Sequence, residues 1–141
     1  MSRIKLELPA QFPFSTEVEV RIGDINYGQH LGNDAVLSFA HEARIRFLKQ
    51  HGFTEANVAG AGMLMVDAVV VYKSQSFHGD VLKVEVAVAD IGRTGCDFLY
   101  RLTNRKDGKE IARVKTGVVF FDYAAGKIHP VPEAFRKAVG I

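Results

Sequence analysis

Hydrophobic residues recur along this chain with two different periods, and the change of period marks the elements. From Val36 to Phe47 they recur every three or four positions, which is typical of one face of an amphipathic helix. Asn33 or Asp34 can cap the start of this helix, and Gly52 stands where a left-handed residue commonly ends one. The sequence therefore predicts one long helix between these caps. Its apolar stripe consists of Val36, Phe39, Ala40, Ala43 and Phe47.

Elsewhere the period is two or the residues are β-branched, which predicts strands. Gly92–Gly95 and Lys106–Lys109 have the composition of hairpin turns, so the later strands are expected to form an antiparallel meander. A short helix over Glu133–Val139 completes the pattern. The expected strands are residues 16–22, 63–77, 81–91, 96–104 and 110–122.

A twisted sheet curls, and the long helix is available to fill its concave face. We therefore expect an α+β fold in which a curved antiparallel sheet of about five strands wraps around one long central helix. The chain shows no internal repeat and no linker, so residues 1–141 are expected to form a single domain.

The charge, cysteine and histidine content of the chain argue against several classes of partner and cofactor. A net charge of +2, with Lys and Arg spread along the chain, argues against a nucleic-acid partner but is compatible with an anionic small ligand such as a nucleotide phosphate. The single cysteine, Cys96, excludes an intrachain disulfide. The five histidines show no metal-ligand spacing, and no phosphate loop or dinucleotide fingerprint is present. The sequence thus predicts neither a metal nor a cofactor.

The amino-terminal residues lack the apolar core of a signal peptide, and no window approaches the length of a membrane span. We therefore expect a cytoplasmic protein without a membrane partner.

The candidate chemistry lies in the loop before the long helix. A helix start offers unpaired amide hydrogens that can hold an oxyanion, and glycines let a ligand approach the backbone. A carboxylate beside such amides suits acyl transfer. Asp and Asn before a helix also serve as caps and turn formers, so both interpretations stay open on local grounds. The polar residues of this loop are Asp24, Asn26, Tyr27, Gln29 and His30, with Gly23, Gly28 and Gly32 between them.

Several short motifs follow one another in a characteristic order. In that order and spacing, the sequence resembles the hotdog-fold acyl-CoA thioesterases of the 4-hydroxybenzoyl-CoA thioesterase type. The resemblance covers essentially the whole chain, and it implies a hotdog fold and hydrolysis of an acyl-CoA to a free acid and CoA. The matching residues are Asp24, His30, Asn33, Glu42-Ala43-Arg44, Phe47-Leu48, Gly79-Asp80, the Gly92–Gly95 hairpin, Asp122, Pro130 and Pro132.

The resemblance also implies roles for individual residues. Asp24 would attack the thioester carbonyl or activate water, and a backbone amide near Leu31 would hold the carbonyl oxygen. His30 is expected to orient Asp24 or the substrate, although a loop histidine can equally bond the backbone. A homodimer or homotetramer with sites at the subunit boundary is also implied. The expected substrate-binding residues are Tyr27, Gly32, Asn33 and Thr94. Tyr27 could cap the pocket or simply pack, and Thr94 could reach across that boundary, although a threonine in a hairpin is more often a plain turn residue.

Other interpretations remain open at this point. A hotdog hydratase or dehydratase would need an acid and a histidine poised together, which only Asp24 and His30 could supply. A non-catalytic acyl-CoA-binding module is a further alternative. Glu42 could be the acid of a different hotdog subtype, but its neighbours Arg44 and Arg46 favour an ion pair instead.

Overall fold

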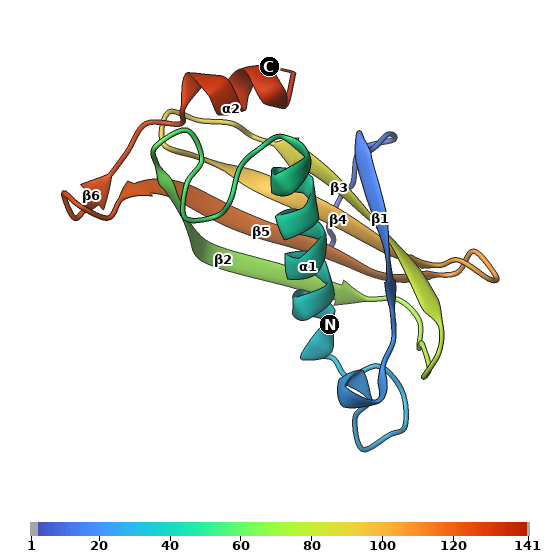
Figure 1. Ribbon diagram of the computed structural model, residues 1–141. Coiled ribbons are helices and arrows are strands. Elements are labelled where there is room, and N and C mark those ends of the chain that lie inside the picture. The colour runs from blue at the N-terminus through green and yellow to red at the C-terminus, as the bar shows by residue number, and fades with distance from the viewer. Residues whose placement is uncertain (1–2, 141) are drawn as a thin grey trace.

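The computed structural model describes residues 3–140, which form one antiparallel sheet with a long helix across one of its faces (Figure 1). In chain order the elements are β1 (Phe14–Glu19), a 3-10 helix η1 (Ile22–Asp24), α1 (Ala35–Gln50), β2 (Gly62–Tyr72), β3 (Val81–Ala89), β4 (Gly95–Asn104), β5 (Glu110–Asp122), β6 (Lys127–Ile128) and α2 (Glu133–Ala138).

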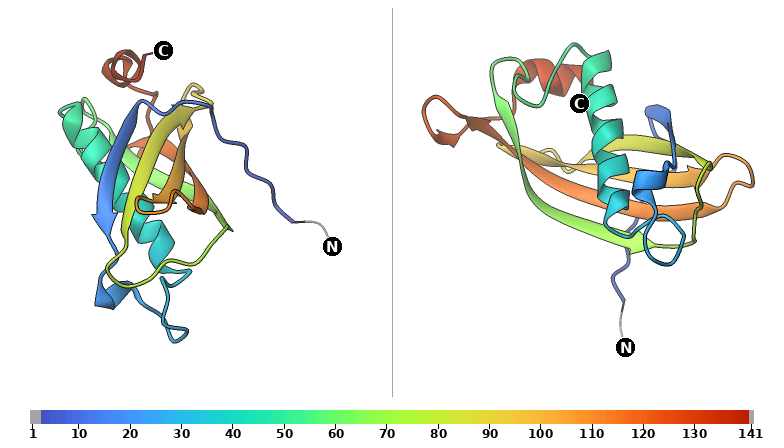
Figure 2. Two further views of the ribbon diagram at one scale, coloured as in Figure 1. Left: turned by 90° about the vertical axis from the view of Figure 1, so that its right-hand side faces the viewer. Right: turned by 60° about the horizontal axis from the view of Figure 1, so that its bottom comes forward.

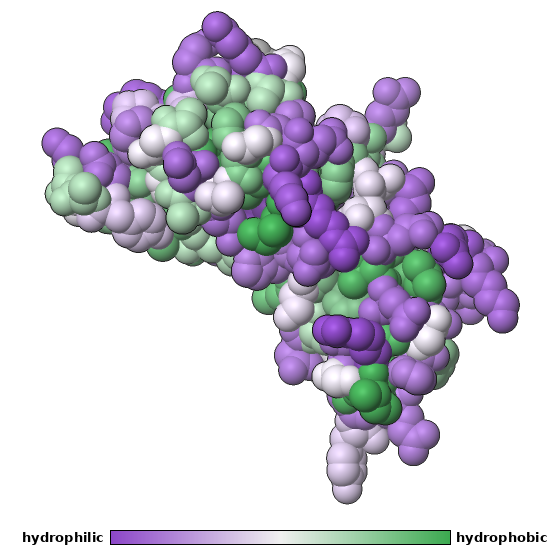
Figure 3. Space-filling view, in the orientation of Figure 1, coloured by the Kyte–Doolittle hydropathy of each residue, from purple (hydrophilic) through white to green (hydrophobic). Residues whose placement is uncertain are grey.

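The central helix α1 forms as its pattern predicts. All five residues of the predicted stripe are buried. Asp34 occupies the cap position, although its side chain makes no capping hydrogen bond. At the other end, the carbonyls of the last turn accept from the amides of Gly52 and Phe53, and Gly52 has a φ of 79°, which is a Schellman ending. The face of α1 turned away from the sheet is largely hydrophilic (Figure 3).

The strands lie in the order β1-β3-β4-β5-β2, all neighbours are antiparallel, and β6 adds to β5. A curved sheet of about five main strands around one helix, as predicted, is therefore confirmed. The residues predicted to share one face of β4 and β5 are all buried, beneath α1 and, at Phe98 and Phe120, also against Phe135 of α2. They are Phe98, Tyr100 and Leu102 on β4, and Ala112, Val114, Thr116, Val118 and Phe120 on β5.

Three predicted strands run past their observed ends, and the one expected over 81–91 does so by two residues, since β3 ends at Ala89. The strand expected over 16–22 ends at Glu19, and Ile22 lies in η1 with 75% of its surface exposed. The alternation continues past the strand because Val20 is still buried, so the pattern alone does not show where pairing stops. The strand expected over 63–77 ends at Tyr72, where the chain leaves β5.

The predicted meander is wrong for β2. It pairs with β5, and β3 pairs with β1 as well as β4, so residues 73–80 cross from the β2 edge of the sheet past β5 and β4 to β3. The polar sequence His78-Gly79-Asp80 does form a turn, because the Asp80 amide donates to the Phe77 carbonyl, but this turn leads into a distant strand rather than a hairpin. Which strand β2 pairs with therefore depends on contacts between residues far apart in sequence.

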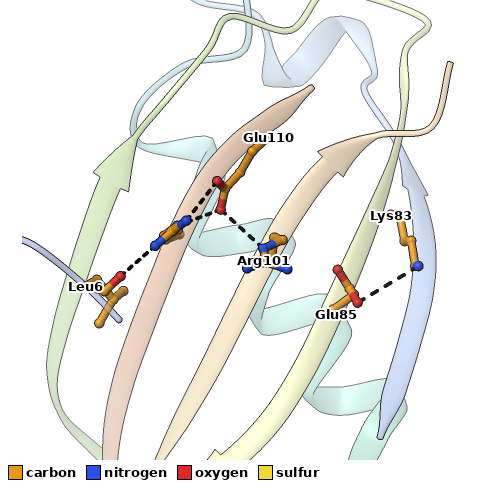
Figure 4. Close-up of polar contacts among 6 residues, drawn as sticks. Leu6, Lys83, Glu85, Arg101 and Glu110 are labelled. Carbon is orange, nitrogen blue, oxygen red and sulfur yellow. Dashed lines mark hydrogen bonds and ion pairs between the residues drawn. The ribbon is translucent and has the colours of Figure 1, made fainter. Parts of the chain in front are cut away.

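The amino-terminal segment lies on the face of the sheet opposite α1 (Figure 2, left). Arg113 on β5 donates to the carbonyl oxygen of Leu6 at 3.0 Å and to Glu110 at 2.7 Å, and Arg101 also reaches Glu110 at 3.3 Å (Figure 4). The ring of Phe12 lies beneath the Arg101 guanidinium. A polar network and the amino-terminal segment therefore lie on part of the outer face of the sheet.

Both edges of the sheet are open, because the described residues give β1 and β2 only one partner strand each. Within residues 3–140, no strand pairs with the outer side of β2. This strand also exposes three consecutive apolar side chains, with exposed fractions of 39% for Leu64, 43% for Met65 and 56% for Val66. No helix in the same range combines the length and apolar composition needed to cross a membrane.

Candidate active site

The loop that carries Asp24 is a compact structure held by its own backbone. One carboxylate oxygen of Asp24 accepts from the Arg21 amide at 2.9 Å and caps η1. At the tip, the Asn26 side chain accepts from the Gly28 amide at 2.9 Å, and Gln29 adopts a φ of 66°. The local sequence explains this shape, since Asp and Asn readily bond backbone amides two or three residues away.

The two ends of the loop meet. The Asn26 amide donates to the carbonyl of His30, and the Gly32 amide donates to the carbonyl of Asp24, both at 2.9 Å. Between these bonds, Ile25 and Leu31 form an isolated β-bridge. The residue that carries the candidate carboxylate is therefore bonded directly to the residues that lead into α1.

The helix start offers fewer free amides than the sequence suggests. The Leu31 amide donates to the carbonyl of Ser76 at 2.7 Å, so it must give up or share this bond to hold an oxyanion. In the described chain, no acceptor lies in hydrogen-bond range of the Asn33 and Asp34 amides. The role predicted for the amide near Leu31 therefore stays a prediction, and the amides without a partner are those of Asn33 and Asp34.

A cavity of about 480 Å³ opens between this loop, the start of α1 and the end of β2. Its apolar side is formed by Leu31, Val36 and Ile111. Tyr72 stands at its rim, and its hydroxyl donates to the carbonyl of Asn33 at 2.9 Å. The remaining lining residues are polar, namely Asn26, His30, Asn33, Lys73, Ser74 and Gln75.

The structure places Asp24 on the other side of the loop. Its side chain lines a second hollow of about 340 Å³, together with Glu42 and Arg46 of α1. No hydrogen bond joins the side chains of Asp24 and His30 in the described residues, and one ring nitrogen of His30 lies 3.1 Å from the carbonyl of Leu31. The acid and histidine that a hydratase would need are therefore not brought together.

Glu42 forms the ion pair that its neighbours predict. Its carboxylate lies 2.7 Å from Nε of Arg46, one helical turn on. Arg46 also donates to the hydroxyl of Thr16 and the carbonyl of Glu17, both at 2.8 Å. The pair therefore fastens α1 to β1.

Two of the predicted substrate-binding residues stand apart from the cavity. Tyr27 is fully exposed at the tip of the loop. Thr94 lies in the β3–β4 connection, and its carbonyl accepts from the Phe120 amide near the far end of β5. Because Asn33 and Tyr72 lie at the opposite end of β2, Thr94 is not part of the cavity within one chain. No group of His, Cys, Asp and Glu among residues 3–140 is arranged to hold a metal ion.

The model of the thioesterase-like superfamily matches residues 20–139, which is most of the chain. The chain belongs to this superfamily. No curated protein matches it in sequence.

Solved structures of named thioesterases share the hotdog fold of this superfamily member. The 1,4-dihydroxy-2-naphthoyl-CoA thioesterase Slr0204 from Synechocystis superposes with a TM-score of 0.82 at 20% identity, over 89% of this chain and 94% of that one. The gentisyl-coenzyme A thioesterase BH1999 gives 0.79 at 17% identity, over 90% and 100%. A thioesterase superfamily protein from Jannaschia sp. CCS1 gives 0.85 at 18% identity, over 96% of each chain.

Sequence reasoning missed a buried polar network beneath the helix of this thioesterase-like chain. Arg44 is 2% exposed, and its guanidinium donates to Glu55 at 2.7 Å and to the Tyr100 hydroxyl at 3.0 Å. Tyr100 also bonds the Thr116 hydroxyl at 2.8 Å, and His41 bonds Glu55 at 2.9 Å. A signal was present, because Arg44 lies four residues after Ala40 and three before Phe47, on the apolar stripe itself.

Burial and pairing act against each other in this network. Burial raises the pKa of Glu55, but the hydrogen bonds and charges of His41 and Arg44 outweigh it, so the pKa lies below its ordinary value. Burial, together with the charge of Glu55, raises the pKa of Tyr100 against the opposing effects of Arg44 and Thr116, so the phenol keeps its proton. The network joins α1 to β4, β5 and the loop after the helix.

Proposed function

We propose that this chain is an acyl-CoA thioesterase that hydrolyses an acyl-CoA thioester to a carboxylic acid and CoA. The observation that carries the proposal is the bond between the Gly32 amide and the Asp24 carbonyl, since it keeps a carboxylate residue beside the free amides of a helix start. Membership of the thioesterase-like superfamily supports the same reaction class.

In this proposal the acyl group enters the cavity of about 480 Å³, with its apolar part against Leu31, Val36 and Ile111. The amides of Asn33 and Asp34, beside Leu31, hold the carbonyl oxygen as it becomes negative. The positive end of the α1 dipole favours the same charge. Gly32 lets the thioester approach these amides, and His30 and Asn33 contact the acyl carbonyl from the rim.

Asp24 lines the neighbouring hollow in this structure, so the proposal requires its carboxylate to turn from the Arg21 amide toward the thioester, where it acts in one of two ways. It attacks the carbonyl carbon and displaces CoA thiolate, which leaves a mixed anhydride that water then cleaves to regenerate the carboxylate. Alternatively, it takes a proton from water as that water attacks the same carbon. A thiolate leaves readily, so a weak base suffices in either route.

The proposal places the complete site at a boundary between two copies. β2 runs from the end of the sheet near Thr94 to the end near Asn33, and its outer edge is open. Antiparallel pairing of two β2 edges about a two-fold axis would bring Thr94 and Met63 of a second copy toward the cavity of the first. The exposed Tyr27 would then lie beside the CoA entrance.

Release of free thiol from a panel of acyl-CoAs tests the proposed function. Because two of the similar structures are thioesterases for aromatic acyl-CoAs, the panel contains aromatic as well as short and long aliphatic acyl groups. A thioesterase frees CoA with at least one member. Loss of enoyl absorbance without free thiol would instead indicate a hydratase, and saturable binding without either change would indicate a binding module.

A further inference from the structure

We propose that Asp80 is a positioning residue for the candidate site. Its carboxylate sets the shape of the segment Ser76–Asp80, and this segment holds both ends of the loop that carries Asp24. We call this segment, with the Asp80 carboxylate that shapes it, the clamp. The effect of the clamp on catalysis rests on the proposed function, whereas its effect on the shape of the loop does not.

The Asp80 carboxylate is the hub of the segment. One of its oxygens accepts from the Ser76 hydroxyl at 3.0 Å, the Phe77 amide at 2.9 Å and the Asn104 side-chain amide at 3.1 Å. Ser76 is completely buried and Asn104 is 6% exposed. If the Asp80 carboxylate were removed, water could not easily replace it as their hydrogen-bond partner. Gly79 closes the turn with a φ of 88°, a conformation that suits glycine.

The segment holds the first end of the site loop through Val20. The Gly79 amide donates to the Val20 carbonyl at 2.9 Å, and the Val20 amide donates to the Asp80 carbonyl at 2.8 Å. Val20 is fully buried and lies four residues before Asp24. The path of the chain into η1 is therefore fixed by the turn that the Asp80 carboxylate stabilises.

The same segment holds the second end of the loop through Leu31. The carbonyl that receives the Leu31 amide at 2.7 Å belongs to Ser76, whose hydroxyl bonds Asp80. Leu31 is buried and precedes the free amides of Asn33 and Asp34. One five-residue segment thus determines how the carboxylate residue and the helix start lie relative to each other.

An amide at position 80 should weaken this clamp. A carboxylate accepts hydrogen bonds about twice as strongly as a neutral amide oxygen. All three donors converge on one oxygen, so the loss affects the Ser76, Phe77 and Asn104 contacts together. The substitution leaves the size of the side chain unchanged and touches no residue of the cavity.

The test compares Asp80→Asn with the matched control Asp122→Asn. Asp122 also accepts two backbone amides in a turn, those of Ala124 and Ala125 at 3.0 Å, but far from the site loop. Two quantities are measured: hydrogen exchange of the Leu31 amide relative to the amides of β4, and kcat and KM for the best acyl-CoA of the panel.

In Asp80→Asn we expect Leu31 exchange to rise about tenfold and kcat to fall about tenfold, with KM within about twofold, because positioning acts on the reacting groups rather than on ground-state binding. The control should change none of these. Folded Asp80→Asn with parental Leu31 exchange and parental kcat would overturn the proposal.

A second variant covers the case in which Asp80→Asn does not fold. Ser76→Ala removes the hydroxyl bond to Asp80 but keeps the carbonyl that receives Leu31. It should shift Leu31 exchange in the same direction by a smaller factor, and an unchanged exchange rate would refute the clamp. If the parent frees no CoA from any substrate, the proposed function fails, while the exchange measurement still decides on the clamp.

Discussion

The amide nitrogen of Gly32 donates to the carbonyl oxygen of Asp24 over 2.9 Å, so the two functional parts of the candidate site, carboxylate and helix start, share a direct backbone bond. Gly32 is itself buried against the Asp24 carbonyl and the Asn26 side chain. A Cβ added there would lie 2.5 Å from the carboxylate of Asp34 and 3.4 Å from Cβ of Asn26.

Gly32→Val is therefore expected to reduce turnover by about a hundredfold, the typical cost of losing an oxyanion donor, with a smaller effect on acyl-CoA binding. A β-branched side chain restricts the backbone and crowds both neighbours. Gly32→Ala should be milder, because the exposed Asp34 carboxylate can turn away. Leu31→Ala should act mainly through packing. The measurement is kcat and KM of the three variants, and a folded Gly32→Val with parental turnover would place the oxyanion site elsewhere.

The Arg44 network predicts a difference between two glutamates. Glu55→Gln leaves the buried Arg44 without a carboxylate and should lower the free energy of unfolding by about 2 kcal/mol at pH 7. Glu42→Gln removes an exposed i,i+4 pair and should cost less than about 0.5 kcal/mol. Urea unfolding of both variants provides the comparison. Equal losses would mean that Glu55 does not stabilise the buried charge.

The same pair has a defined pH dependence. The pKa of Glu55 is lower in the folded protein than its ordinary value of 4.5, so its contribution to stability is complete above pH 4.5 and is lost as the pH falls through the folded pKa. The gap in unfolding free energy between the parent and Glu55→Gln should accordingly stay constant from pH 7 to about pH 5 and close at lower pH. A gap that widens on acidification would contradict this sign.

Much of this architecture follows from the sequence because local patterns specify it. The stripe from Val36 to Phe47 and the ending at Gly52 predict α1, and alternation predicts which face of β4 and β5 is buried. The pairing of β2 with β5 does not follow, since no local signal distinguishes the turn at Gly79 from a hairpin. Such pairings depend on contacts that close long loops.

The site was predicted in composition but not in geometry. The motif residues around Asp24 and His30 do lie in one loop, yet their side chains face separate hollows. The bond from Leu31 to Ser76 joins residues 45 positions apart, which no local pattern reveals. The burial of Arg44 could be predicted, because this residue is a charge on an apolar stripe. Its partner Glu55 could not be predicted, because Glu55 lies in an irregular loop.

The open edge of β2 predicts the oligomeric state. An unpaired strand that exposes Leu64, Met65 and Val66 is normally covered, and two copies can pair their edges. We expect a homodimer or homotetramer by light scattering at micromolar concentration. The double variant Leu64→Lys/Val66→Lys should shift the mass toward the monomer, whereas Ile45→Lys on the exposed face of α1 should not. A monomeric parent that hydrolyses acyl-CoA would contradict a shared site.

Cys96 should not react with a thiol reagent in the folded protein. Burial, followed by the charge of Asp97, raises the pKa of this thiol to about 12, and only 5% of the residue is exposed. A thiol reagent at pH 8 should therefore detect no protein thiol before unfolding and one per chain in denaturant. Rapid labelling of the native protein would show that the β4 end of the sheet opens.

Turnover of Asp24→Asn measures the central claim most directly. The substitution keeps the size of the side chain and an oxygen that can still cap the Arg21 amide, so melting temperature should change little. It removes the carboxylate that attacks the thioester or activates water. With the best acyl-CoA of the panel, free CoA release should fall by about a hundredfold or more relative to the parent. Parental turnover in a folded Asp24→Asn would contradict the account and direct attention to Glu42, the α1 carboxylate that lines the same hollow.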